Sequence, residues 1–217
     1  MSTVPGDDDA LRSRPETGEL GQVGGGRIEV GCLSAYVVRW WDPRPALPPV
    51  RTALLTSNLE LLGPIVEATS GVPADAVTNV LPPLTGALRL GDEDAALQAA
   101  EGLIGLGPGL TPAGDDLLVG LLSALVCLAP PRFTDLAARV SAAAKGRTTE
   151  LSLALLRHAS LGNCVGAVGV LLRALAGAGD LLTAHRRLLS IGHSSGPALH
   201  FGVVLGADIV ARPAAGP

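Results

Sequence analysis

Apolar residues recur at helical spacing through the second half of the chain. Asp92 opens the first clear example as a typical N-cap, and Glu93 and Asp94 suit the positive end of a helix dipole. One face of the following segment carries Ala95, Ala96, Ala99, Ala100, Leu103 and Ile104. We therefore predict a helix over about residues 92–104.

Further apolar segments repeat this pattern. Thr111 and Pro112 suit the N-cap and first position of a helix, and Thr134 suits another N-cap. The predicted helices cover residues 111–128, 134–145, 148–158, 163–175, 180–190 and 196–210. Shorter helices are expected over 58–70 and 73–80. The pattern indicates an α+β fold that is predominantly helical, a helix bundle with a small N-terminal β element.

The first part of the chain has a different pattern. Residues 1–26 combine acidic residues, proline and a glycine run without an apolar period, so we expect a disordered leader. β-branched and aromatic residues over 27–41 predict two short strands. We expect a single domain over residues 27–217, with a β-containing part over 27–90 and a helical part with glycine-rich loops over 91–217.

Composition narrows the functional classes. The 217 residues are 47% hydrophobic and 2% aromatic, so the core must be aliphatic. The chain also has few aromatic side chains on which nucleic-acid bases could stack. The 16 basic and 20 acidic residues form no basic cluster that would bind a phosphate backbone. The longest uncharged stretches, 117–131 and 159–172, are shorter than a membrane helix, and acidic residues stand where a signal peptide is basic. We expect a cytoplasmic protein that binds neither nucleic acid nor membrane.

A glycine-rich loop at residues 105–116 is the first candidate for chemistry. It holds four glycines and two prolines directly before a predicted helix, where free N–H groups and the helix dipole favour an anion. The predicted substrate-binding residues of this loop are Gly107, Gly109, Thr111 and Gly114. A tight turn between two helices is the alternative explanation.

Asp115 and Asp116 follow this loop and complicate the anion hypothesis. Two carboxylates at one helix end repel a naked anion, so they either complement the helix dipole or hold a cation such as Mg²⁺. They are therefore candidate catalytic residues and candidate metal ligands. Mg²⁺ is the one cofactor that the sequence suggests.

A second glycine-rich turn, GHSSG at residues 192–196, precedes another apolar helix. It fits the G-x-S-x-G pattern of a serine hydrolase, but the residues before it have a helical pattern where that motif needs a strand. No distant histidine follows Ser194 to serve as its base. His193 is instead a candidate general acid or hydrogen-bond donor, and Ser194, Ser195 and Gly196 are candidate substrate-binding residues.

The two loops share a weak internal similarity. Gly114 and Gly120 have the same spacing as Gly196 and Gly202. We expect both loops to frame one site, where two sets of backbone donors suit a small anion with two acidic ends; chance similarity between aliphatic helices is the alternative. Thr149 is a further candidate for binding the anion, although a helix cap alone explains it.

These motifs resemble a known family. The string GLGPGLTPAGDDLLVGLL, the Thr-Thr segment, LLRHAS and GHSSG are similar to a bacterial domain, formerly of unknown function, assigned as the small third subunit of oxamate carbamoyltransferase. The resemblance covers residues 102–207. In that family the second motif usually reads GHTSGxD, whereas Ser194 replaces the threonine here and Ala198 stands at the aspartate position.

The resemblance implies a part in anaerobic allantoin catabolism. There a three-subunit enzyme converts oxalurate and phosphate to oxamate and carbamoyl phosphate. It implies partner subunits, activity only in their presence, and small anionic ligands such as carbamoyl phosphate, phosphate or oxamate. The alternative is a non-catalytic helical protein, diverged from that family, that binds a small molecule or assembles with a partner.

Overall fold

The chain forms two compact units, Met1–Asp42 and Pro43–Pro217. The computed structural model describes residues 18–62 and 72–212. Within that part, a small antiparallel sheet lies in the first unit and every helix lies in the second. The α+β, predominantly helical fold class is therefore confirmed.

The sheet of the first unit has the strand order β1-β2-β3, with β1 at Gly21–Gly24, β2 at Arg27–Val30 and β3 at Leu33–Tyr36. Gly25 and Gly26 join the first two strands with φ of 56° and 76°, which suits the tight turn of a hairpin. The expectation of a leader without structure is corrected for β1, because its glycine run forms this turn. Residues 1–17 of the expected leader lie outside the described residues.

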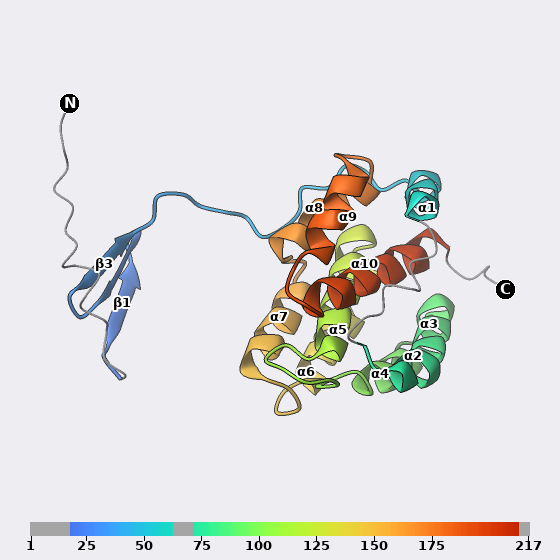
Figure 1. Ribbon diagram of the computed structural model, residues 1–217, viewed down its shortest axis with the longest axis horizontal. Coiled ribbons are helices and arrows are strands. Elements are labelled where there is room, and N and C mark those ends of the chain that lie inside the picture. Colours follow the sequence, from blue (N-terminus) through green and yellow to red (C-terminus); the bar gives the residue numbers. More distant parts are fainter. Residues whose placement is uncertain (1–17, 63–71, 213–217) are drawn as a thin grey trace. The chain divides into compact units, whose positions relative to one another are not determined.

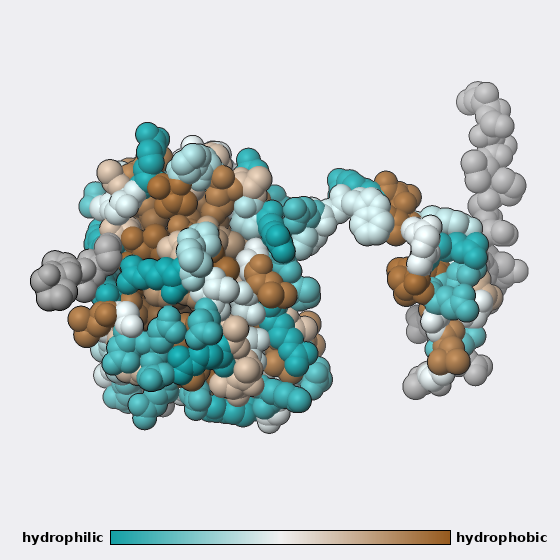
Figure 2. Space-filling model, turned by 180° about the vertical axis from the view of Figure 1, so that it is seen from behind, coloured by the Kyte–Doolittle hydropathy of each residue, from teal (hydrophilic) through white to brown (hydrophobic). Residues whose placement is uncertain are grey.

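The apolar side chains of this small unit are exposed. Val23 is 81% exposed, Tyr36 67% and Trp40 84%. Strands of four residues have too little area to bury these side chains against one another. Figure 2 shows apolar side chains on the surface of this unit.

The second unit is a bundle of helices (Figure 1). They are α1 (Thr52–Leu61), α2 (Ala74–Asn79), α3 (Leu81–Leu90), α4 (Glu93–Glu101), α5 (Ala113–Leu128), α6 (Thr134–Ala143), α7 (Glu150–Ser160), α8 (Gly166–Leu175), α9 (Leu181–Leu189) and α10 (Ser195–Ala211). Figure 1 shows α5 and α10 crossing in the middle of the unit, with the other helices around them. The helices expected between residues 92 and 210 are confirmed, with ends shifted by a few residues.

Glycines allow α5 and α10 to approach closely. A Cβ at Gly120 would lie 2.1 Å from the carbonyl oxygen of Leu199, and one at Gly202 would lie 2.0 Å from that of Leu117. These distances are far below van der Waals contact, so the two backbones touch at a place that no side chain can occupy. The second glycine of each matching pair, Gly120 and Gly202, therefore serves reciprocal packing of the two helices, an explanation that the sequence alone did not offer.

Two N-terminal helices differ from expectation. The helix expected over 58–70 is α1, which begins at Thr52 and ends at Leu61, and residues 63–71 lie outside the described residues. Helix α3 is not among the expected helices, and it contains Pro82 and Pro83. They occupy the first turn of α3, where a missing N–H costs no hydrogen bond.

Nothing among the described helices has both the length and the apolar character needed to cross a membrane.

Candidate functional site

The two glycine-rich loops meet at the N-terminal ends of α5 and α10. The hydroxyl of Thr111 lies 3.1 Å from that of Ser195, although the two residues are 84 positions apart. The start of α7 joins the same region, because Thr149 Oγ1 donates a hydrogen bond of 2.7 Å to the carbonyl oxygen of Leu110. Three of the predicted binding residues therefore come from distant segments into one place.

Asp115 is a buried residue whose carboxylate links neighbouring segments of this region through hydrogen bonds. It is fully buried in the first turn of α5. The N–H of Gly105 donates to its Oδ1 at 2.8 Å, and the hydroxyl of Thr148 donates to its Oδ2. Both carboxylate oxygens thus have donors, as a buried charge requires. Asp115 joins the glycine-rich loop, α5 and the start of α7, which is a positioning role.

Asp116 lies next to Ser195 of the second glycine-rich loop. Its side chain is 2% exposed, and its Oδ2 atom has no hydrogen-bond partner within the described part of the chain. Burial raises the pKa of this carboxyl, while hydrogen bonds from Ser195 and Thr111 act in the opposite direction and the charge of Asp115 adds to the rise. The junction of the loops therefore contains an acid whose surroundings favour its neutral form.

A shared Mg²⁺ does not fit Asp115 and Asp116. Adjacent helix positions point in different directions, and here one carboxyl faces the start of α7 and the other the start of α10. The oxygens of Asp115 already accept protein donors, and a raised pKa at Asp116 opposes the ionised form that a metal needs. Over residues 18–62 and 72–212 no three His, Cys, Asp or Glu side chains gather in a way that could hold a metal. The donor set thus gives no support to the expected metal site.

The glycines of the loops fall into two groups. Gly107 and Gly109 have φ of 111° and 104°, and a Cβ at Gly109 would meet nothing within 4 Å, so that position is open to a ligand. Gly114 and Gly196 are buried, and their Cβ positions would lie 2.1 Å from the oxygen of Leu103 and 2.5 Å from that of Leu188. Helix packing explains the last two glycines, so they no longer indicate a ligand.

The remaining predicted residues of the second loop lie around the start of α10. His193 is exposed, and Ser194 is the N-cap residue of α10 without a side-chain capping hydrogen bond. Helix α9 precedes this loop, where the serine hydrolase motif needs a strand. Ala198, at the position of the family's aspartate, is 1% exposed. The polar contact of this loop with Thr111 is therefore made by Ser195.

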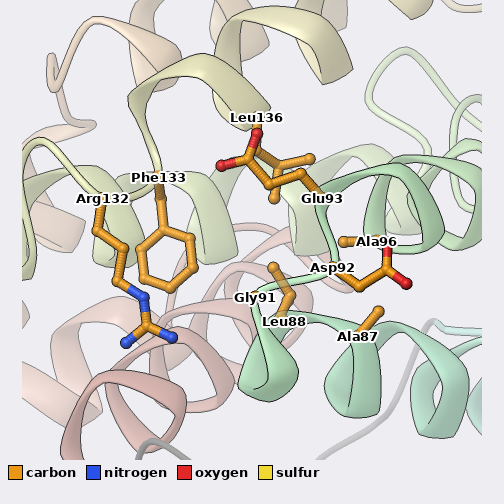
Figure 3. Close-up of a pocket in the computed structure, with 9 residues that line it drawn as sticks. All are labelled: Ala87, Leu88, Gly91, Asp92, Glu93, Ala96, Arg132, Phe133 and Leu136. Carbon is orange, nitrogen blue, oxygen red and sulfur yellow. The ribbon is translucent and has the colours of Figure 1, made fainter.

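A separate pocket of about 240 Å³ was not suggested by the sequence. Figure 3 shows it between the turn that joins α3 to α4 and the start of α6. The guanidinium of Arg132 lies 4.7 Å from the centre of the Phe133 ring, and Asp92 and Glu93 stand across the pocket. No motif in the sequence marks these residues, because Asp92 and Glu93 also act as the N-cap and first turn of α4.

Fold and site together define a class of helical domain. In it, the N-terminal ends of two helices, each preceded by a glycine-rich loop, meet at a buried polar site. Residues 103–207, from just before the first loop to near the end of α10, match the family model described as oxamate carbamoyltransferase subunit AllH. The resemblance seen in the sequence is therefore confirmed over this segment. No curated protein and no solved structure matches the chain.

Proposed function

We propose that this protein is a subunit of an oxamate carbamoyltransferase-like complex, which converts oxalurate and phosphate to oxamate and carbamoyl phosphate. Its contribution is to bind a small anion at the junction of the two glycine-rich loops. The binding groups are the hydroxyls of Thr111 and Ser195, the carboxyl of Asp116 and the open backbone at Gly109. The observation that carries this proposal is the buried Oδ2 of Asp116, which lacks a hydrogen-bond partner among the described residues, in a carboxyl that contacts the hydroxyls of Ser195 and Thr111.

The raised pKa of Asp116 weakens the main objection to an anion at this helix end, because burial favours the protonated carboxyl. An ionised carboxylate repels phosphate or oxamate, whereas a protonated carboxyl donates a hydrogen bond to it. A bound anion at Asp116 Oδ2 also stabilises the protonated form, so proton and anion binding reinforce each other. The oxygens of Asp115 accept hydrogen bonds from Gly105 and from Thr148, just before α7, so they are already occupied by protein donors.

Calorimetric titration of the full-length chain with phosphate, carbamoyl phosphate and oxamate tests this proposal. Loss of one hydrogen bond to a charged ligand costs roughly 1.5–3 kcal/mol, so Thr111→Val and Ser195→Ala should each weaken the affinity by about tenfold or more. Ser190→Ala is a matched control, because that hydroxyl donates to the backbone carbonyl oxygen of Arg187 at the end of α9. Absence of binding to all three anions, with and without the larger subunits, would overturn the proposal.

Substitution of Asp116 separates a neutral donor from a charged group. Asp116→Asn keeps a donor of similar shape and removes the charge, so anion affinity should persist at pH 7. Asp116→Leu removes the donor and should abolish binding. If Asn and Leu weaken binding equally, the carboxyl acts through its charge and the proposed role is wrong.

Assembly without anion binding is the second candidate function. The exposed Tyr36, Trp40 and Trp41 of the first unit favour it, because large exposed aromatic residues are typical of protein interfaces. Reconstitution with the two larger subunits distinguishes the candidates. Under the first function Ser195→Ala lowers turnover and leaves assembly intact, whereas under the second it changes neither.

A further inference from the structure

Two cysteine thiols meet in the second unit, away from the loop junction. Cys127, near the end of α5, and Cys164, just before α8, place their sulfur atoms 3.7 Å apart. Both are free thiols, and both approach the carbonyl oxygen of Gly162, at 3.5 and 3.8 Å. A disulfide needs an S–S distance of about 2.04 Å, so the sulfurs must close by roughly 1.7 Å, which side-chain rotation can supply.

We propose that Cys127 and Cys164 are a redox modification site, which a small peroxide converts to an intramolecular disulfide and a dithiol reductant restores. The inference is independent of the anion site, because it concerns the opposite end of α5.

The surroundings assign different roles to the two thiols. Cys127 is partly exposed and Cys164 is 5% exposed, so a small oxidant such as hydrogen peroxide fits the site better than a protein oxidant. The hydrogen bond from the Cys127 thiol lowers the pKa of Cys164, and the same interaction raises the pKa of Cys127. Cys164 is therefore the thiol of the pair that ionises more readily, and Cys127 acts as the resolving thiol.

The chemistry balances in two steps. The Cys164 thiolate attacks one peroxide oxygen, the O–O bond breaks, and the products are a sulfenic acid and hydroxide. The Cys127 sulfur then attacks the Cys164 sulfur, forming the S–S bond and displacing hydroxide, which takes up the Cys127 proton and leaves as water. Two thiols are oxidised and one peroxide is reduced to two waters overall.

The cross-link would act on the place where the chain enters the helical unit. The backbone N–H of Cys164 donates to the carbonyl oxygen of Pro43 at 2.9 Å, and Pro43 is the first residue of that unit. A disulfide to α5 fixes the loop before α8 to the central helix. The backbone of Pro43 then accepts its hydrogen bond from a residue, Cys164, that is covalently fixed to α5.

Thiol counting on the full-length protein tests the proposal. After treatment of the folded protein with peroxide, we expect free thiols to fall from three to one and the intact mass to fall by about 2 Da. Peptide mapping should join the segments that contain Cys127 and Cys164, and dithiothreitol should restore three thiols. A cross-link through Cys32, or conversion to sulfinic acid without a cross-link, would overturn it.

The third cysteine provides the matched control. Cys32 is exposed and belongs to the first unit, so Cys32→Ser should form the same cross-link at the same rate. Cys127→Ser should leave Cys164 as a sulfenic acid that a dimedone probe labels. The wild-type chain in urea should oxidise about tenfold more slowly, because unfolding removes the proximity of the sulfurs. Equal rates for folded and unfolded chains would contradict the proposal and need no variant that must fold.

Discussion

The two units of this protein use their apolar side chains in opposite ways. The helical unit buries leucine, valine and alanine around α5 and brings helices together through glycine, as at Gly120 and Gly202. The small sheet contains Tyr36 and leads to Trp40 and Trp41, and all three aromatic side chains are exposed. The helical unit thus has a core of its own, whereas the first unit presents large exposed side chains of the kind found at protein interfaces.

The largest expected effect comes from filling the contact between α5 and α10. Gly120→Val or Gly202→Val places side-chain atoms where a backbone carbonyl oxygen already lies, so we expect a loss of about 3 kcal/mol or more in the free energy of unfolding. Urea denaturation followed by far-UV circular dichroism measures it. Gly86→Ala in α3 is the control, because its added Cβ meets nothing within 4 Å, and it should be neutral or stabilising.

Acid should destabilise the helical unit through a buried histidine. His200 is fully buried, and its Nε2 atom lies 2.8 Å from Nδ1 of His185. Burial lowers the pKa of His200 to about 4. The unfolded chain takes up this proton near pH 6.5 and the folded protein near pH 4. The stabilisation is therefore present above pH 6.5 and is lost as the pH falls toward 4, by about 3 kcal/mol.

Unfolding measured across that pH range in wild type and His200→Leu checks this expectation. The variant should have a flatter profile between pH 6.5 and 4, whatever its stability at pH 7. Equal slopes would show that other groups cause the acid sensitivity.

Asp116 should have the opposite pH dependence, and a smaller effect. Its pKa is raised in the folded protein, so its contribution to stability is full below about pH 3.8 and is lost as the pH rises through the raised value. Asp116→Asn has no such loss. The melting temperature of the variant relative to wild type should therefore increase from pH 4 to pH 8. A constant difference would contradict the raised pKa.

The smallest effect is expected in the first unit. Trp40 is 84% exposed, so Trp40→Ala should change the free energy of unfolding of the helical unit by less than about 0.5 kcal/mol. Leu118→Ala in the buried face of α5, by comparison, should cost roughly 2–5 kcal/mol. A large effect of Trp40→Ala would mean that its side chain supports the core, and the contrast between the units would fail.

Capping residues in the sequence mark some helix starts and miss others. The N-cap residues of α5 and α6 are Pro112 and Phe133, not the expected Thr111 and Thr134. Asp92, Thr149 and Asp180 were expected at helix starts, and the side chain of each accepts a hydrogen bond from a backbone N–H of the first turn. Helix α3, with prolines in its first turn, was not predicted, and the glycines that join β1 to β2 were assigned to a disordered leader. Proline and glycine are compatible with either a break or an ordered turn, and the tertiary contacts decide which one forms.

The candidate site was predictable in part. The two loops were expected to meet, and the contact between Thr111 and Ser195 brings them together. The excess of glycine predicts a ligand, but Gly114 and Gly196 face carbonyl oxygens of neighbouring segments. A sequence shows that a position must be small, but not whether a helix or a ligand occupies the space beside it. The same holds for the adjacent Asp115 and Asp116, whose different surroundings arise only in the folded chain.

The central claim is that the two glycine-rich loops form one anion site, and a double-mutant cycle tests it most directly. Phosphate affinity is measured by calorimetry for wild type, Thr111→Val, Ser195→Ala and the double variant. Because the two hydroxyls contact each other, we predict that the combined loss is smaller than the sum of the single losses by about 1 kcal/mol, within the range for residues in contact. Losses that add fully, or single variants that bind phosphate as wild type does, would contradict the account.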